Sequence, residues 1–167
     1  MNDDSKGAVI SDCGTYRYAL WRTLAPRESV DMGGVVLWVM VNPSTATATE
    51  DDATVRKVMG FSRRWGFGQA RIVNLYALRS RDPKALLTHP NPIGPDNDHF
   101  IGTEAAAADA IVLAWGNNAN HERAKAVRQF IEANVEHTPI WHLGLTGKGQ
   151  PSHPLMLGYD TPRVEID

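Results

Sequence analysis

The chain has 167 residues, a length typical of one folded domain with its own hydrophobic core. Hydrophobic residues make up 43% of it and charged residues 22%, which argues against a disordered protein. The formal net charge of −2 argues against a protein that coats nucleic acid, and the longest apolar run, Val35–Val41, is far too short to cross a membrane.

The first part of the chain predicts two strands. Residues 1–12 are polar and are expected to form a flexible N-terminus, ahead of a single α/β domain over residues 13–167. Large apolar and polar side chains alternate over Tyr16–Arg22, a pattern typical of a strand. A turn is expected over residues 26–34, before the run Val35–Val41, which is rich in β-branched residues and suits a strand buried on both faces.

The rest of the chain alternates helices and strands. A helix is expected to begin at Asp52 or Thr54, either of which can cap it, and to end near Trp65, because Gly66 and Gly68 follow. The later elements are a strand over Ala70–Tyr76, a helix over Asp96–Asp109, a strand over Ala110–Trp115, a helix over His121–Asn134 and a strand over Thr138–Leu143.

This alternation predicts a three-layer α/β sandwich. Its central sheet is expected to have four mostly parallel strands, with the N-terminal strand added antiparallel at an edge. Ligands of such sheets bind at the carboxyl ends of the strands. The site is therefore expected among the loops that follow the strands, over residues 42–56, 74–82, 115–120 and 143–155.

The first of these loops is rich in polar side chains. Asn42, held by the following proline, has an amide that can position a water molecule, and Ser44 and Thr45 add hydroxyl groups. Asp51 and Asp52 can act as a general base or stabilise a positive charge. Asp52 is equally consistent with a helix cap that has no role in a site. Arg56 adds a cation at the end of the loop.

The second and last loops carry further candidates. Asn74 interrupts an apolar run and can pair with the edge of a base, although it is also consistent with an asparagine that only satisfies a turn. His153, between two prolines, can donate to a leaving base or contact a phosphate, whereas most surface histidines do neither. Candidate contacts to an anion are Arg79, Ser80, Arg81 and Lys148.

The distribution of basic residues leaves two interpretations open, whereas the cysteine content argues against a zinc site. Basic residues gather between Arg56 and Lys84, which fits either a nucleic-acid-binding face or an ordinary solvated helix. Cys13 is the only cysteine, and no Cys/His cluster has the spacing of a zinc site. No secretory signal is visible at the N-terminus, so we expect a cytoplasmic protein without a metal.

The motifs resemble a known family over nearly the whole chain. The domain of unknown function 1643, from prokaryotes and phages, is similar in the segments Ser11–Arg22, Val41–Ala46, Asp51–Arg56, Val73–Ala77 and Asp82-Pro83. This resemblance implies no activity.

A second, looser resemblance is to the uracil-DNA glycosylase superfamily, and it implies both a fold and an activity. Asn42-Pro43-Ser44 resembles its water-positioning Asn-Pro-Gly loop, and Asn74 resembles the asparagine that pairs with the base. Other similar segments are Arg81-Asp82-Pro83, Leu113–Gly116 and His153-Pro154. Leu155 replaces an expected serine, and the insertion over residues 45–56 has no counterpart, which points to a base other than uracil.

The resemblance implies an enzyme that hydrolyses an N-glycosidic bond of a base flipped out of DNA, without a cofactor. Modified phage bases and a role in phage defence are the implied setting. In that reading Asn42 with Asp51 or Asp52 positions water, Asn74 reads the base together with Ser44 and Thr45, and His153 stabilises the leaving group. Contacts to the DNA backbone are assigned to Arg56, Arg79, Ser80, Arg81 and Lys148.

Two other functions remain open at this point. One is a module of the same fold that binds a nucleotide or modified nucleic acid without turnover. The other is a hydrolase of free nucleosides or nucleotides, in which Asp51 and Asp52 hold the ribose hydroxyls. The identity of the base and the oligomeric state are not predicted.

Overall fold

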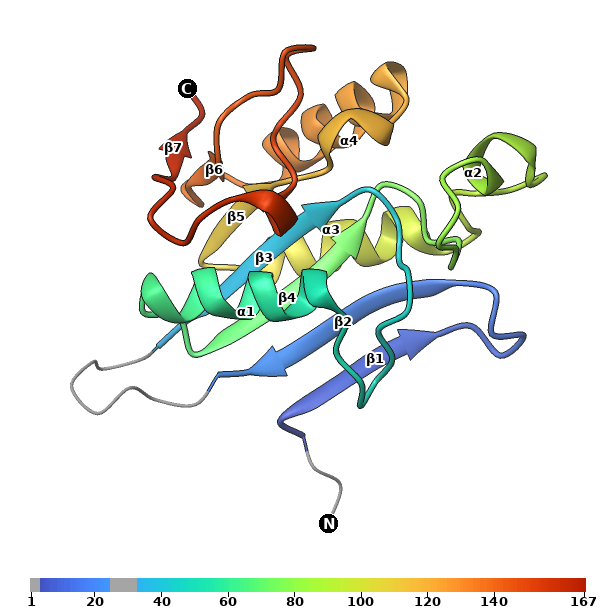
Figure 1. The fold of residues 1–167 in the computed structure, drawn as a ribbon, viewed down its shortest axis with the longest axis horizontal. Helices are drawn as coiled ribbons and strands as arrows, with labels where there is room; N and C mark the ends of the chain where they lie inside the picture. Colours follow the sequence, from blue (N-terminus) through green and yellow to red (C-terminus); the bar gives the residue numbers. More distant parts are fainter. Residues whose placement is uncertain (1–3, 25–32) are drawn as a thin grey trace.

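A computed structural model of the chain describes residues 4–24 and 33–167 (Figure 1). The predicted turn over residues 26–34 lies outside the described residues, apart from Gly33 and Gly34. The strands are β1 (Lys6–Ile10), β2 (Arg17–Thr23), β3 (Val35–Met40), β4 (Gln69–Asn74), β5 (Ala110–Leu113), β6 (Ile140–His142) and β7 (Val164–Glu165). The helices are α1 (Ala53–Arg64), α2 (Ala85–Thr88), α3 (Asn97–Ala107) and α4 (His121–Asn134), with 3₁₀ turns at Gly116–Asn118 and Pro154–Met156.

The seven strands of the described residues form one mixed sheet in the order β1-β2-β4-β3-β5-β6-β7. Strand β3 pairs in parallel with β4 and β5, and β5 pairs in parallel with β6. The pairs β1–β2, β2–β4 and β6–β7 are antiparallel. The described part of the chain is therefore a mixed α/β structure, as expected.

The sheet is larger than predicted, because both of its edges carry an extra strand. Within the segment expected to be flexible, residues 1–12, Lys6–Ile10 pairs with β2, so β2 is not the edge strand. At the other edge, the two exposed residues of β7 pair with β6. Strand β1 is mostly part-buried and ends in the apolar run Ala8-Val9-Ile10, whereas β7 is exposed; for strands this short, pairing with a neighbour decides the structure.

Helices cover both faces of the sheet. Alternate residues of β3 pack against the helices on opposite faces. Val36, Trp38 and Met40 pack in one core cluster with residues of α1. The alternate residues Leu37 and Val39 pack in a second cluster with residues of α3 and α4. Successive side chains of a strand point to opposite faces, so a continuous apolar run serves both clusters. Figure 1 shows α1 in front of the sheet and α3 behind it.

The parallel strands bring their carboxyl ends to one edge of the fold. Met40, the last residue of β3, is in register with Asn74, the last residue of β4. On the other side of β3, Val39 is in register with Leu113 at the end of β5. The loops that follow these strands therefore begin side by side. No helix in the described ranges is both long and apolar enough to cross a membrane.

Candidate functional site

A cavity of about 220 Å³ lies where these strands end, beside the N-terminus of α1. It is lined by residues from the loops after β3, β4, β5 and β6, together with residues of β2 and α1. The predicted site residues that line it are Asn42, Ser44, Asp52, Asn74, Ser80, Arg81 and His153. These side chains come from segments more than one hundred residues apart, and the fold brings them together.

Asn42 is held in a single orientation by its amide nitrogen. The Nδ2 donates to the Pro43 carbonyl at 3.0 Å and to the Ser80 carbonyl at 2.9 Å. The Ser80 N–H in turn donates to the Pro43 carbonyl at 3.0 Å, which ties the loop after β3 to the loop after β4. With both donor positions used, Oδ1 of Asn42 accepts no hydrogen bond from the described residues. This oxygen is left to accept one from a ligand or a water molecule.

Asp52 caps α1 and also lines the cavity, so the two roles considered for it coexist. Its Oδ1 accepts from the Val55 N–H at 2.9 Å, and its Oδ2 accepts from the Ala46 N–H at 3.3 Å. The second bond closes the loop after β3 back onto the helix. Each carboxylate oxygen has a further lone pair, so the negative charge remains available to a ligand.

Asn74 lies at the end of β4 and is almost completely buried, with 2% of its surface exposed. Its carbonyl accepts from Nδ2 of Asn97 at 2.9 Å, at the start of α3. Its own side-chain Nδ2 is buried and has no hydrogen-bond partner among the described residues. Buried amide groups are normally paired, so this one lacks a partner that such a group usually has, and its residue lines the cavity.

His153 is held as one neutral tautomer. Its Nδ1 accepts from the Leu155 N–H at 3.2 Å, which leaves the proton on Nε2 as a donor. Burial lowers the pKa of His153, and the Asp52 carboxylate opposes that shift. The close approach of the loop after β6 depends on Gly116, whose φ is +67°. A Cβ at Gly116 would lie 3.3 Å from the Cβ of His153.

Sequence reasoning missed Arg17, which lines the cavity from β2. It is 4% exposed, and its Nη1 donates to the Ala46 carbonyl at 2.8 Å. Burial lowers the pKa of Arg17 to about 10, while the Asp52 carboxylate opposes the shift. Arg17 fits the alternation of apolar and polar side chains expected over Tyr16–Arg22, so the sequence did not mark it as a buried residue. Asn118 also lines the cavity, from the loop over residues 115–120, which was expected at the site without a named candidate residue.

Asp51 does not line the cavity, although it is next to Asp52. Its Oδ1 accepts from Nε of the buried Arg22 at 2.7 Å. Nη2 of Arg22 also holds this loop, through bonds to the Thr47 carbonyl at 2.8 Å and the Glu50 carbonyl at 3.4 Å. The helix cap turns Asp52 inward, and the pair with Arg22 turns Asp51 away.

Four other predicted residues also lie off the cavity. Arg56 donates to the Asp51 carbonyl at 2.8 Å, and Arg79 donates to the Gly14 carbonyl at 3.1 Å, so both help to hold loops. Lys148 is exposed in the loop after β6, and Thr45 is half-buried behind the cavity lining. Their sequence positions are close to the site, but the turns between them and the strand ends point their side chains elsewhere.

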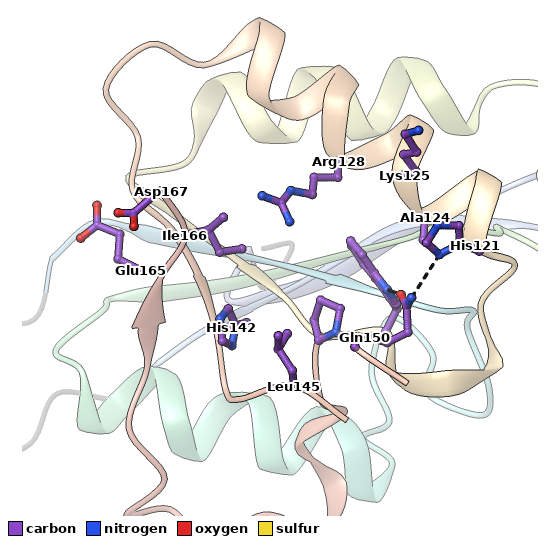
Figure 2. Close-up of a pocket in the computed structure, with 13 residues that line it drawn as sticks. His121, Ala124, Lys125, Arg128, His142, Leu145, Gln150, Glu165, Ile166 and Asp167 are labelled. Atoms are coloured by element: carbon purple, nitrogen blue, oxygen red, sulfur yellow. Dashed lines mark hydrogen bonds between the residues drawn. The ribbon is translucent and has the colours of Figure 1, made fainter. Parts of the chain in front are cut away.

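A second cavity of about 400 Å³ lies between α4 and β6 and contains none of the predicted site residues. Figure 2 shows Arg128 and Lys125 on its α4 side, and His142 and Leu145 opposite. Arg128 pairs with Glu132 at 2.6 Å, and Gln150 lies 3.4 Å from His121. None of the buried, unpartnered polar atoms found in the described residues belongs to its lining. The smaller cavity is therefore the better candidate site.

The described residues contain no group of three His, Cys, Asp or Glu side chains that could hold a metal ion. A sequence model of a family described as "Protein of unknown function (DUF1643)" matches residues 17–155. The matched segment begins at Arg17 and ends at Leu155, and it contains the entire lining of the candidate site. No curated protein and no solved structure matches the chain.

Proposed function

Because the chain belongs to the DUF1643 family of proteins of unknown function, we propose its function from the chemistry of the site. The proposed activity is hydrolysis of the N-glycosidic bond of a base flipped out of DNA, with a uracil-DNA glycosylase-like arrangement of the fold. The base is a modified one in this proposal, and defence against phages is its setting.

One observation carries the proposal: Asn42, Asp52, Asn74 and His153 line a single cavity. Its volume of about 220 Å³ is below the range of about 300–1,000 Å³ common for drug-sized ligands. A space of this size favours one base rather than a complete nucleotide. An enzyme that extrudes a base from DNA needs such a pocket, with hydrogen-bonding groups for the edge of the base.

The reaction breaks the bond between C1′ of the sugar and a ring nitrogen of the base. The electron pair of that bond leaves with the base, and the sugar becomes positively charged in the transition state. The Asp52 carboxylate stabilises the cationic sugar. Oδ1 of Asn42, free to accept, orients a water molecule whose oxygen bonds to C1′. The proton that this water loses ends on the departed base, so one water is consumed for each base released.

His153 stabilises the departing base as a neutral hydrogen-bond donor. Its Nδ1 is engaged by the backbone, so Nε2–H is the group that faces the negative charge. A neutral imidazole keeps this proton and donates a hydrogen bond to an oxygen of the base. Burial favours the same neutral form by lowering the pKa of His153.

The surroundings of the cavity support DNA as the substrate. Arg81 lines it and is exposed, so its charge can meet a phosphate. Leu155 also lines the cavity, and the next residue, Met156, is 90% exposed. An exposed apolar side chain beside a base pocket can fill the gap that an extruded base leaves in the stack.

One observation favours a second candidate, a module that binds a base or nucleotide without turnover. Both oxygens of Asp52 already accept hydrogen bonds from backbone N–H groups, so the carboxylate has a structural role in the loop and the helix cap. In the proposed hydrolase this matters little, because Asp52 acts through its charge and does not remove a proton. The free-nucleoside alternative is less well supported, because Asp51 pairs with Arg22 and does not line the cavity.

The test is a screen of DNA duplexes and single strands, each containing one uracil or one modified pyrimidine. Excision gives an abasic site, seen as cleavage after alkali, and an equal amount of free base, seen by mass spectrometry. We expect Asn42→Ala to lose about 10²-fold or more in rate. The matched control is Asn134→Ala, which removes an exposed asparagine at the end of α4.

The outcomes separate the candidates. Saturable binding with no abasic site from any substrate indicates the binding module. Release of base from free nucleosides, but not from DNA with the same base, indicates the nucleoside hydrolase. Full activity of Asn42→Ala contradicts the proposed role of the amide.

A further inference from the structure

Arg17 and Arg22 lie on the same strand and are equally buried, with 4% and 3% of their surfaces exposed. Arg22 uses all three nitrogens, in an ion pair with Asp51 and in bonds to backbone carbonyls. Arg17 differs, because its Nε is buried and has no hydrogen-bond partner among the described residues. Only Arg17 of these two lines the cavity.

An unpartnered guanidinium nitrogen in a protein interior is costly, since a guanidinium offers only donors and loses its bonds to water. Nη1 of Arg17 is fixed on the Ala46 carbonyl, which sets the plane of the group. The missing partner of Nε must be an acceptor. The Asp52 carboxylate favours the charged form of Arg17 electrostatically, but among the described contacts the two side chains form neither a hydrogen bond nor an ion pair.

Asn74 also lines the cavity, and its Nδ2 is a second buried donor without a hydrogen-bond partner among the described residues. Nε2–H of His153 is a third donor, given the bond to its Nδ1. Three residues that line one cavity, on β2, β4 and the loop after β6, therefore each carry a donor without a partner among the described residues. A ligand that satisfies them presents oxygen atoms rather than amino groups along its edge.

We propose that Arg17 is a specificity-determining residue that selects bases bearing an acceptor oxygen on the edge facing β2, either a ring carbonyl or a carboxylate substituent. This inference rests on the proposed function for the identity of the ligand as a base. It adds a requirement that hydrolysis alone does not impose, because a base that places an amino group against Arg17 is rejected. Such rejection is steep when a site has buried donors that remain unpaired.

The test measures binding of free bases to the full chain, without bond cleavage, by calorimetry and by competition. The probes are uracil, 5-carboxyuracil and cytosine, which has an amino group where uracil has a carbonyl. We expect cytosine to bind at least about 10-fold more weakly than uracil, a factor equivalent to one lost hydrogen bond. If 5-carboxyuracil binds more tightly than uracil, the acceptor that faces Arg17 is the carboxylate substituent. If the two bases bind equally, the acceptor is a ring carbonyl.

The variant Arg17→Lys keeps the charge but removes the Nε donor and the planar fork, so the preference for oxygen-bearing bases should disappear. Arg22→Lys is the matched control, because it changes an equally buried arginine off the cavity, and its ranking of bases should equal that of the unchanged protein. If Arg17→Lys does not fold, Asn74→Asp replaces a donor by an acceptor on the same wall. This variant should weaken the binding of 5-carboxyuracil more than the binding of uracil.

Failure of this inference and failure of the proposed function give different results. An unchanged ranking in Arg17→Lys, or no binding of any oxygen-bearing base at millimolar concentration, overturns the inference even if DNA is converted to abasic sites. Arg17-dependent binding of free bases without any abasic product supports the inference and contradicts the hydrolase.

Discussion

Nε of Arg22 and Oδ1 of Asp51 lie 2.7 Å apart, in an ion pair that anchors the loop between β3 and α1. The adjacent Asp52 faces the cavity instead and caps α1. Two neighbouring carboxylates therefore have separate tasks: the first holds the loop, and the second meets the substrate in the proposed reaction.

Variants of these two residues should separate stability from activity. Asp51→Ala leaves the buried Arg22 without its carboxylate and should lower the free energy of unfolding by roughly 1–3 kcal/mol. The excision rate of the folded protein should stay within about twofold, since the catalytic groups are untouched. Asp52→Asn should keep the cap, because asparagine caps helices as well as aspartate does. Its excision rate should nevertheless fall by about 10²-fold, because the charge is lost.

Urea denaturation measures the first effect and the rate of abasic-site formation the second. Equal loss of activity in both variants at full stability would contradict the division of roles.

His153 should give the excision rate a shifted pH dependence. The neutral imidazole is the proposed active form, and burial lowers its pKa below the ordinary value of 6.5. The rate should therefore stay high as the pH falls through 6.5 and drop only below it. The same shift makes the folded state less stable in acid, because the unfolded chain takes up a proton at His153 first.

This loss of stability begins as the pH falls below the unfolded pKa and is complete below the folded one. His153→Gln should lack that part of the acid destabilisation, whereas His137→Gln, a change at an exposed histidine, should keep it. An acid limb centred at or above pH 6.5 would speak against the neutral form.

Gly116 should be sensitive to any side chain for two separable reasons. Its φ of +67° costs an alanine about 1–2 kcal/mol, and the added Cβ lies 3.3 Å from His153. Gly149 has a similar φ of +76° with nothing within 4 Å of the added Cβ. Both alanine variants should therefore lose stability, but only Gly116→Ala should also lose excision activity. Thermal unfolding and single-turnover assays at the same temperature check this, and equal activity in the two variants would count against a positioning role for Gly116.

Arg81 should contribute to DNA affinity through a phosphate. Arg81→Ala should weaken binding to all DNA sequences alike and reduce the slope of log K against log salt by about one. Arg128→Ala, a change at the second cavity, should leave the slope unchanged. Fluorescence anisotropy across a series of salt concentrations measures both. A slope near zero for the unchanged protein would favour a free base or nucleoside over DNA.

Met156 should matter for duplexes and not for single strands. An apolar side chain that replaces an extruded base is needed only where a stacked helix has to be opened. We expect Met156→Ala to slow excision from duplex DNA by about 10-fold, within the few kcal/mol that unstacking costs, and to leave single-stranded substrates unaffected. Leu87→Ala is the control, because Leu87 is similarly exposed, at 85%, but, unlike Met156, has no chain neighbour that lines the cavity. An equal effect on both kinds of DNA would contradict this assignment.

Much of the fold was accessible from the sequence because its strands are unusually apolar. The run from Val35 to Val41 predicted β3 to within one residue, and the helix His121–Asn134 was predicted with the observed bounds. Carboxyl ends of neighbouring parallel strands share an edge of the sheet. That rule alone brought Asn42, Asn74 and His153 to one predicted site, and they line one cavity.

Other features depend on contacts between distant segments, which a local pattern does not contain. The strands β1 and β7 are short, at five and two residues, and they are defined by pairing with β2 and β6. Arg17 enters the cavity because the antiparallel pairing of β2 with β4 places that side chain beside the strand ends. Asp51 and Asp52 were both predicted as site carboxylates, and the ion pair with Arg22 and the cap of α1 separate them in the structure. Hydrophobic periodicity encodes the strands and the order of their ends, whereas hydrogen bonds across the sheet decide which polar groups face the ligand.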